Sequence, residues 1–332
     1  MLVEEIQDNL DQDIPFVIYR KPNQREVLYI KEEKGTKSFI FSSFDQKQQL
    51  RILYQEAQII TISKQEVKKL QLSKTKFTND NVKESVYQER IQDIIDYIQE
   101  GKADKIVFSR SILLEHQVDV LKTLNNLLDQ YTNAFCYLWY HPETGMWLGA
   151  TPETLTQIQG DCLNTMSLAG TKTPKQTWSV KEIQEQKVVS DYIKQQLEPF
   201  SKEIQVSEVQ TIQSGAIEHL LTKISATLKN HHYKEVIEKI HPTPAVCGVP
   251  TEKAKAYIKE FEKYDRLFYT GFLGELNDDH VELYVNLRCA QLNATQVKLY
   301  VGGGINTLSN PQKEWQETQW KAQTIQKCLV IK

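Results

Sequence analysis

The chain has 332 residues, of which 40% are hydrophobic and 25% are charged, values typical of a folded protein with a sizeable core. Its formal net charge of −3 shows no basic excess, which argues against nucleic acid or an acidic membrane surface as a partner. The longest apolar runs fall far short of the ~20 residues that span a bilayer, and the acidic N-terminus lacks a signal-peptide pattern. Five scattered cysteines without a Cys-x-x-Cys pair are typical of a reduced cytoplasm, so we expect a cytoplasmic protein without a zinc or disulfide framework.

The first third of the chain is predicted to be rich in strands. Residues 15–32 have the pattern of a β-hairpin that turns at residues 21–23, and residues 38–44 form a further strand. A helix then ends near Gly101, a residue suited to a helix C-cap. The apolar stripe of this helix consists of Tyr87, Ile91, Ile94, Ile95 and Ile98.

The middle of the chain continues with strands and one helix. An apolar strand is predicted over residues 105–114, and residues 134–141 and 146–151 form strands around a turn. Residues 155–170 have the pattern of a second hairpin. The spacing of apolar residues then predicts a helix over residues 179–197.

The last third combines a proline-rich loop, two helices and three strands. After the loop at residues 241–250, Thr251 is suited to cap a helix over residues 252–264. The final helix begins at Asn310-Pro311, an N-cap followed by proline at the first helical position. Because the strands follow one another between helices without alternating βαβ units, we expect an α+β fold. The strands of this part are predicted over residues 271–276, 281–292 and 296–305.

Two of the predicted helices begin with carboxylates on the face that continues as an apolar stripe. Glu182 and Glu185 share this face in the helix after Ser179, and Glu314 and Glu317 share it in the last helix. Inward carboxylates are costly unless they are paired or bind a cation, and two such pairs could converge on one divalent metal, for which magnesium fits best. The alternative is two ordinary first turns, where the helix dipole favours glutamate, and by spacing alone this is the more frequent case.

Other residues have chemistry that their position leaves open. Lys105 opens an apolar strand and would act as a base if burial lowered its pKa, or else it is a solvated strand end. Glu153 follows a Gly-Ala-Thr-Pro turn as a general acid or as a turn-capping carboxylate. Arg288, expected within a strand, is a carboxylate clamp or a structural ion-pair partner. Residues 302–304 are three glycines, which either present backbone N–H groups to a substrate carboxylate or form a flexible strand exit.

The separate features form one pattern when they are taken in chain order. Between about residues 100 and 327 the chain contains KIVFSR, WLGATPETL, SLAGTKTP, KEIQEQK, EHLLTKI, the stretch from HPTPAVCGVP to GFLGEL, VNLRCAQL, and the stretch from LYVGGGI to KAQTI. In this order the segments resemble the chorismate-utilising enzyme family. The resemblance implies one large α+β fold of layered antiparallel or mixed β-sheets with helices packed outside. Within it, residues 1–95 would form an N-terminal β-rich subdomain packed on the same fold, and residues 96–332 the chorismate-binding catalytic region.

The resemblance implies a metal site built from the carboxylates. Glu185 and Glu317 would be direct magnesium ligands, and Glu182 and Glu314 would support the metal, most simply through water. The metal would bind the ring carboxylate of chorismate. Lys321, one turn beyond Glu317, would face the same region, although by spacing alone these two residues could also be a surface ion pair.

The resemblance also assigns the remaining contacts of the substrate. The enolpyruvyl carboxylate would be held by Arg288, Tyr269 and the backbone around Gly302 and Gly304. His219 would line the ring, although a lone histidine is more often structural.

The attacking group is indicated by the residues at a few positions. Lys105 matches the lysine that activates water in isochorismate and salicylate synthases, and Glu153 would protonate the departing C4 hydroxyl. Ala169, beside Gly170, occupies the position where aminodeoxychorismate synthases carry a nucleophilic lysine. The small Ala245 in the proline-rich loop is similar to isochorismate synthases. The resemblance therefore implies water, rather than ammonia or a lysine, as the nucleophile.

We accordingly expect a magnesium-dependent isomerase of the isochorismate synthase type, acting on chorismate as a monomer without an obligatory amidotransferase partner. Salicylate synthase, which would go on to release pyruvate, remains an alternative, as does a component of an anthranilate or aminodeoxychorismate synthase. Gln184 and Gln186 depart from the histidine or arginine often found beside the metal glutamate in the family. Menaquinone and siderophore synthesis are both open as the pathway served.

Overall fold

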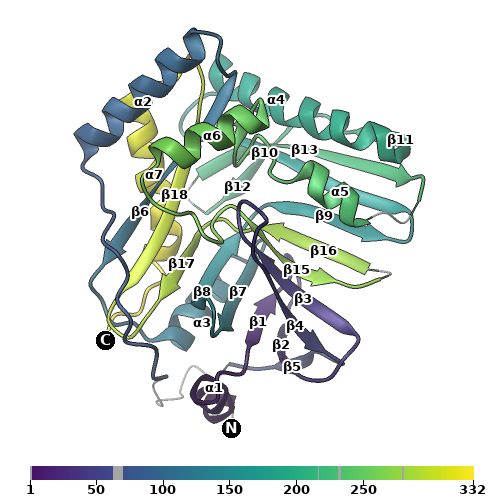
Figure 1. Ribbon diagram of the computed structural model, residues 1–332, viewed down its shortest axis with the longest axis vertical. Helices are drawn as coiled ribbons and strands as arrows, with labels where there is room; N and C mark the ends of the chain where they lie inside the picture. The colour runs from purple at the N-terminus through teal and green to yellow at the C-terminus, as the bar shows by residue number, and fades with distance from the viewer. Residues whose placement is uncertain (1, 63–69, 216, 231–232, 279) are drawn as a thin grey trace.

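The predicted N-terminal hairpin is present, and it belongs to the first of two β-sheets in the computed structural model (Figure 1). β1 (Phe16–Arg20) and β2 (Val27–Lys31) pair antiparallel, and Asn23 in their turn has a positive φ of 61°, which asparagine tolerates. This sheet, sheet A, has the strand order β14-β6-β18-β17-β8-β7-β1-β2-β5. Its other strands are β5 (Gln58–Ile60), β6 (Lys105–Leu114), β7 (Phe135–His141), β8 (Gly145–Thr151), β14 (Gly248–Val249), β17 (Cys289–Leu292) and β18 (Val297–Ile305).

The second sheet, sheet B, contains the predicted hairpin of residues 155–170. Its strand order is β11-β13-β10-β9-β16-β15-β3-β4, and β12 also pairs with β13. Every strand pairing among the described residues is antiparallel, in both sheets. The strands are β3 (Lys37–Ser42), β4 (Gln49–Tyr54), β9 (Thr154–Gln159), β10 (Cys162–Lys172), β11 (Ser201–Val206), β12 (Gln210–Ser214), β13 (Ile217–Leu228), β15 (Phe272–Leu276) and β16 (His280–Val285).

Aromatic side chains fill the space between the two sheets. Phe135 of sheet A stacks on Tyr284 of sheet B with 4.1 Å between ring centroids, and Phe41 of sheet B lies edge-on to Trp147 of sheet A. Such pairs contribute beyond the burial of their area, because ring edges and faces carry opposite partial charges. The layer continues to Tyr300 on β18, which stacks on Trp147 and belongs to the same buried cluster.

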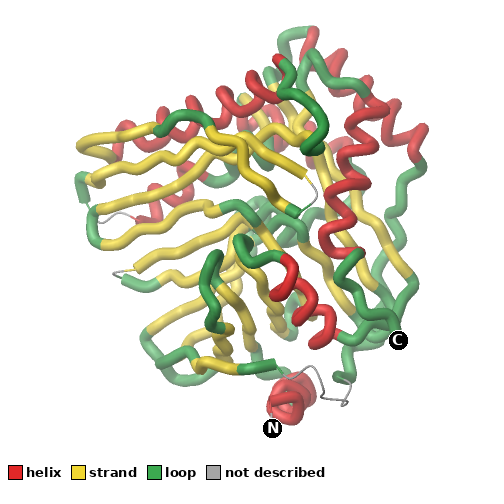
Figure 2. Tube along the Cα trace, turned by 180° about the vertical axis from the view of Figure 1, so that it is seen from behind, coloured by secondary structure: helices red, strands yellow, loops and turns green. Residues whose placement is uncertain are grey.

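Helices cover the outer faces of the two sheets (Figure 2). The stripe predicted between residues 87 and 98 is buried, and Gly101 follows that helix with a φ of 73°. The helices of the described part are α1 (Leu2–Asp11), α2 (Glu84–Gln99), α3 (Val120–Gln130), α4 (Val180–Leu197), α5 (Tyr233–Ile240), α6 (Thr251–Phe261) and α7 (Pro311–Gln326), with a 3₁₀ turn at Glu198–Phe200. α4 packs on sheet B, and α5 lies against α4 and shares its apolar cluster with sheet B; α3 and α7 pack on sheet A, and α2 lies against α7.

Two details of the predicted elements are wrong. Thr251 is the first residue of α6 and Pro250 stands at its N-cap, so the threonine side chain does not cap the helix. Residues 281–292 are not one strand, because the chain leaves β16 of sheet B at Val285 and enters β17 of sheet A at Cys289. Arg288 lies in this crossover with a φ of 47°, and not within a strand as expected.

The predicted fold class is confirmed: the protein is α+β, with two layered sheets and helices outside. The structure describes residues 2–62, 70–215, 217–230, 233–278 and 280–332, and no helix in these ranges is long and apolar enough to cross a membrane. The N-terminal strands extend both sheets, since β1, β2 and β5 join sheet A while β3 and β4 join sheet B. A division of the fold at residues 95/96 stays a prediction, and that boundary falls inside α2.

Candidate active site

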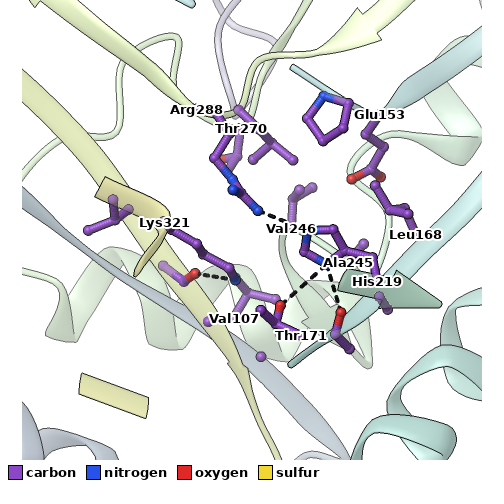
Figure 3. A pocket seen from close by; sticks show the side chains of 18 of the residues that line it. Val107, Glu153, Leu168, Thr171, His219, Ala245, Val246, Thr270, Arg288 and Lys321 are labelled. Carbon is purple, nitrogen blue, oxygen red and sulfur yellow. Dashed lines mark hydrogen bonds between the residues drawn. The ribbon is translucent and has the colours of Figure 1, made fainter. Parts of the chain in front are cut away.

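A pocket lies between the two sheets, where β6 and β18 of sheet A face β10 and β13 of sheet B (Figure 3). It encloses about 620 Å³ outside the protein atoms, part of it open to solvent. In Figure 3, Arg288, Glu153, His219 and Lys321 approach this space from different elements. The pocket brings together the following residues that were singled out from the sequence: Glu153, Ala169, Gly170, Glu185, His219, Ala245, Tyr269, Arg288, Gly302, Gly304 and Lys321.

Lys105 begins β6 and is 2% exposed, so it is not the solvated strand end that was its alternative. Its Nζ lies 3.0 Å from Oε1 of Glu185 and makes no hydrogen bond of good geometry with the described residues. A Cβ atom at Gly304 would lie 2.7 Å from Cε of Lys105 and would collide with the Glu185 carboxylate. Glycine at position 304 therefore leaves the space that these two side chains occupy.

Three of the four predicted metal glutamates are buried and approach the same stretch of β18. Glu185 comes from the second turn of α4, and Glu314 and Glu317 come from the first two turns of α7. A Cβ atom at Gly303 would lie 3.1 Å from Oε2 of Glu314 and 3.4 Å from Oε1 of Glu317. The glycines are buried inside β18, so they are not a flexible strand exit.

Glu182 differs from the other three glutamates. Its Oε2 accepts hydrogen bonds from the backbone N–H (2.9 Å) and the hydroxyl (2.6 Å) of Ser179, which completes a capping box. Glu182 therefore behaves in this structure as an ordinary first-turn glutamate that caps its own helix. Support of a metal by Glu182 through water stays a prediction.

Each of the three buried carboxylates is paired with a lysine. Glu185 faces Lys105, Lys321 Nζ lies 2.6 Å from Oε1 of Glu317, and a third lysine, Lys181 of α4, lies 2.6 Å from Oε1 of Glu314. The predicted pair of Glu317 and Lys321 exists, but it is largely buried and not a surface contact. Lys181 was not singled out from the sequence, although its spacing of four residues from Glu185 places both on one helix face.

Burial and the lysines act in opposite directions on these acids. Burial raises the pKa of Glu314 to about 7, although the ammonium of Lys181 opposes this shift. Burial also acts to raise the pKa of Glu317, but Lys321 and Lys181 outweigh it and hold that pKa below its ordinary value. The pKa values of Glu314 and Glu317 shift in opposite directions because Glu317 interacts with both Lys321 and Lys181, whereas Lys181 is the main counter-charge of Glu314.

Glu153 stands between β8 and β9 and is buried in the pocket wall. Burial raises its pKa to about 8, in spite of the opposing charges of Lys105, Lys321 and Arg288. The carboxyl group is therefore protonated at neutral pH, which is the state that a general acid needs.

Arg288 and His219 form a hydrogen-bonded pair on one side of the pocket (Figure 3). The His219 Nδ1 lies 2.7 Å from the carbonyl of Gly170, so Nδ1 donates and Nε2 accepts from the Arg288 guanidinium at 3.1 Å. Burial, helped by Arg288, lowers the pKa of His219 to about 3, so the ring is neutral. Arg288 also donates to Thr324 Oγ1 at 3.2 Å.

The guanidinium of Arg288 is buried and forms no ion pair with any carboxylate of the described residues. Its alternative role as a structural ion-pair partner is therefore not supported, and its charge is available to an anion. Backbone strain gathers here, because Leu267, Thr270 and Arg288 all have a positive φ of 47–60°. Tyr269, between the first two, is stacked on Tyr300 at 5.6 Å and forms the pocket wall.

The pocket also contains residues that the sequence did not single out. Thr171 Oγ1 lies 3.4 Å from Nδ1 of His219, at an irregularity where the pairing of β10 with β13 shifts register between Ala169 and Lys172. Such a bulge has no periodic signal, and only the paired strand reveals it. The other lining residues missed from the sequence are Val107, Pro152, Leu168, Val246, Thr270, Leu287, Tyr300 and Val301.

The acidic cluster fits a hard divalent cation. Its donors are all carboxylate oxygens, the ligands that magnesium prefers, and the buried Oε2 of Glu314 makes no hydrogen bond with the described residues. Within the described ranges, however, no three acidic, histidine or cysteine side chains already form a metal-ligand set. Each of the three buried carboxylates instead contacts a lysine.

The protein is thus an α+β protein of two layered β-sheets, with a pocket between them that acidic and basic side chains line. The chain belongs to the chorismate-binding enzyme family, whose model matches residues 26–330. The family predicted from the motifs between about residues 100 and 327 is therefore confirmed, and the match also includes the N-terminal strands from β2 onward.

Comparison with individual proteins gives the same family. The chain is 30% identical over 240 residues to isochorismate synthase MenF of Haemophilus influenzae, covering 68% of this chain and 56% of that protein. It is 31% identical over 243 residues to isochorismate synthase EntC of Escherichia coli, covering 68% and 62%. With isochorismate synthase DhbC of Bacillus subtilis the identity is 29% over 270 residues, covering 74% and 68%. The chain thus spans a little over half to two thirds of the length of these relatives.

Two solved structures share the fold along almost the whole chain. The isochorismate synthase DhbC of Bacillus anthracis, described as specific for 2,3-dihydroxybenzoate, has a TM-score of 0.80 at 24% identity and covers 99% of both chains. The menaquinone-specific isochorismate synthase MenF of Escherichia coli has a TM-score of 0.80 at 21% identity, covering 95% of this chain and 88% of that one. Both confirm the two-sheet architecture.

Proposed function

We propose that the protein is an isochorismate synthase, an isomerase that converts chorismate to isochorismate in the presence of magnesium. The observation that carries this proposal is the placement of three buried groups. Glu153, which is protonated, and Arg288, whose guanidinium has no carboxylate partner among the described residues, line one pocket, and Lys105 lies behind its wall in contact with the lining residue Glu185. The sequence relatives described above, which are isochorismate synthases, support it.

The reaction exchanges one hydroxyl group for another and leaves the composition of the substrate unchanged. Lys105 accepts a proton from water while the oxygen bonds to C2 of the ring. The ring double bonds shift, the bond between C4 and its hydroxyl breaks, and Glu153 gives its proton to the leaving oxygen, which departs as water. The ammonium formed on Lys105 is stabilised by Glu185, whose carboxylate oxygen lies 3.0 Å away.

The remaining groups hold the two carboxylates of the substrate. Arg288 offers a buried charge for the enolpyruvyl carboxylate, and the neutral His219 keeps its guanidinium in place. Glu185 and Glu317 would be direct ligands of magnesium, with Glu314 supporting it through water. When bound, magnesium supplies a Lewis-acidic charge that holds and neutralises the ring carboxylate.

We also propose that the enzyme works as a monomer in the cytoplasm without an amidotransferase. Water is the nucleophile in this chemistry, so no partner is needed to supply ammonia. Ala169 and Ala245 line the pocket without a nucleophile of their own, in agreement with this choice.

The proposed function is tested by incubation with chorismate and magnesium chloride, with the products identified by chromatography and NMR. We expect isochorismate without salicylate or pyruvate. Salicylate together with pyruvate would assign the protein as a salicylate synthase, and an aminated product that requires ammonia would assign it as an anthranilate or aminodeoxychorismate synthase component. A complete lack of turnover would contradict all three.

The protonated state of Glu153 predicts the alkaline side of the pH profile. Because its pKa is raised to about 8, the acid is present below that pH, and turnover is expected to fall about tenfold for each pH unit above it. Glu153→Gln is expected to lower kcat by about 10²–10⁴-fold and to remove this alkaline limb. Measurement of kcat from pH 6 to 10 for both proteins checks this, and an unchanged limb in Glu153→Gln would assign it to another group.

A further inference from the structure

Lys181 turns inward from a helical turn that is otherwise exposed. It is the second residue of α4, and its neighbours Val180 and Ile183 are 61% and 54% exposed. Its own side chain is only 13% exposed and ends 2.6 Å from Oε1 of Glu314, on the first turn of α7. A lysine in the first turn of a helix is disfavoured by the helix dipole, so the Glu314 contact has to offset this cost.

Lysines accompany all three buried carboxylates of the acidic cluster. Lys181 and Lys321 place two positive charges beside Glu314 and Glu317, and Lys105 faces Glu185. Buried carboxylates without counter-charges would be strongly destabilising, and the lysines reduce that cost without any metal. Lysine ammonium groups therefore lie at the carboxylates where a divalent cation would bind.

The Lys181 contact uses one oxygen of Glu314 and leaves the other unused. Oε1 is held by the ammonium, whereas Oε2 is buried and makes no hydrogen bond with the described residues. An ammonium at 2.6 Å from a carboxylate repels a divalent cation that approaches the same group. The turn around Lys181 is exposed, so its flexible side chain has solvent to move into when it leaves.

We propose that Lys181 is the resident counter-cation of Glu314, and that it gives up this carboxylate when magnesium enters the acidic cluster. The inference rests on the proposed function, because it concerns the same metal site. In the metal-free protein Lys181 maintains the fold of the cluster, and for the same reason it weakens the affinity for metal when no substrate is present.

The first test is titration of the metal-free protein with magnesium or manganese alone, followed by calorimetry. Lys181→Met keeps the length and apolar stem of the side chain but removes its charge, and we expect it to bind the metal on the order of tenfold more tightly than wild type. Lys187→Met is the matched control, since Lys187 lies on the same helix in an exposed pair with Asp191, and it should bind metal as wild type does. Unchanged or weaker metal binding in folded Lys181→Met would overturn the inference.

The same variants allow a second readout in thermal unfolding. Metal-free Lys181→Met should melt at a lower temperature than wild type, and magnesium should restore most of the difference. Equal melting temperatures without metal would show that Lys181 is not the counter-charge of the cluster.

A measurement on the wild type remains decisive if the variant does not fold. Amine acetylation followed by mass spectrometry should show Lys181 reacting faster once magnesium is added, because its ammonium is released to solvent. A reactivity that magnesium does not raise would overturn the inference. Wild-type turnover of chorismate that does not depend on magnesium would instead contradict the proposed metal site itself, so the two failures can be told apart.

Discussion

Lys105→Gln is expected to abolish conversion of chorismate while the protein stays folded. Glutamine keeps most of the volume and a polar end beside Glu185, but it cannot accept a proton from water. Loss of a general base typically costs about 10²–10⁴-fold in rate, and we expect kcat to fall by at least about a thousandfold. Chromatographic product assays on enzyme at high concentration, with the melting temperature measured in parallel, check the result.

Lys102→Gln is the matched control for this variant. Lys102 lies three residues earlier, is exposed and pairs with exposed Glu100, so its replacement should leave both turnover and the melting temperature unchanged. Turnover that persists in Lys105→Gln would remove Lys105 as the base. The water would then have to be activated by another group of the pocket.

Glu317→Gln is expected to remove the magnesium dependence of chorismate binding. The substitution preserves shape but removes a negative charge that lies beside Gly303 and faces Lys321. Replacement of groups that only support a metal ligand costs about 10–100-fold, so we expect the loss of a direct ligand to exceed a hundredfold in metal affinity. Calorimetric titration of chorismate with and without magnesium measures this.

The control for Glu317→Gln is a glutamate that lies away from the pocket. Glu89 is exposed on α2, the helix that packs against α7, and Glu89→Gln changes the net charge by the same amount. It should bind magnesium and chorismate as wild type does. If Glu317→Gln retained the wild-type magnesium dependence, the metal would have to be placed on other ligands.

The sequence predicted the elements whose signal is local. The stripe from Tyr87 to Ile98 and the Asn310-Pro311 helix start depend on neighbours within a few residues, and both are present in the structure. The same reasoning failed at residues 286–288, where apolar residues on both sides of Arg288 suggested one strand. Each half of that segment pairs with a different sheet, and the pairing partners are distant in the sequence.

Spacing also could not decide which glutamates turn inward. Glu182 and Glu185 share a helix face by periodicity, yet Glu182 caps its own helix while Glu185 reaches Lys105. The capping box is visible in the sequence as Ser179 followed three residues later by a glutamate. That signal was present, but it gives no information on whether a further ligand competes for the carboxylate.

By itself, the sequence determined the fold class, the order of motifs and the chemical types that meet in the pocket, because periodicity and residue identity are properties of the chain. Only the tertiary structure decided that Lys105 is buried, that Glu153 keeps its proton and that Lys181 faces Glu314. These properties arise from burial and from charges on helices and strands that are far apart in sequence. Lys181 and Glu314 are separated by more than a hundred residues, and their contact exists only because α4 and α7 begin side by side.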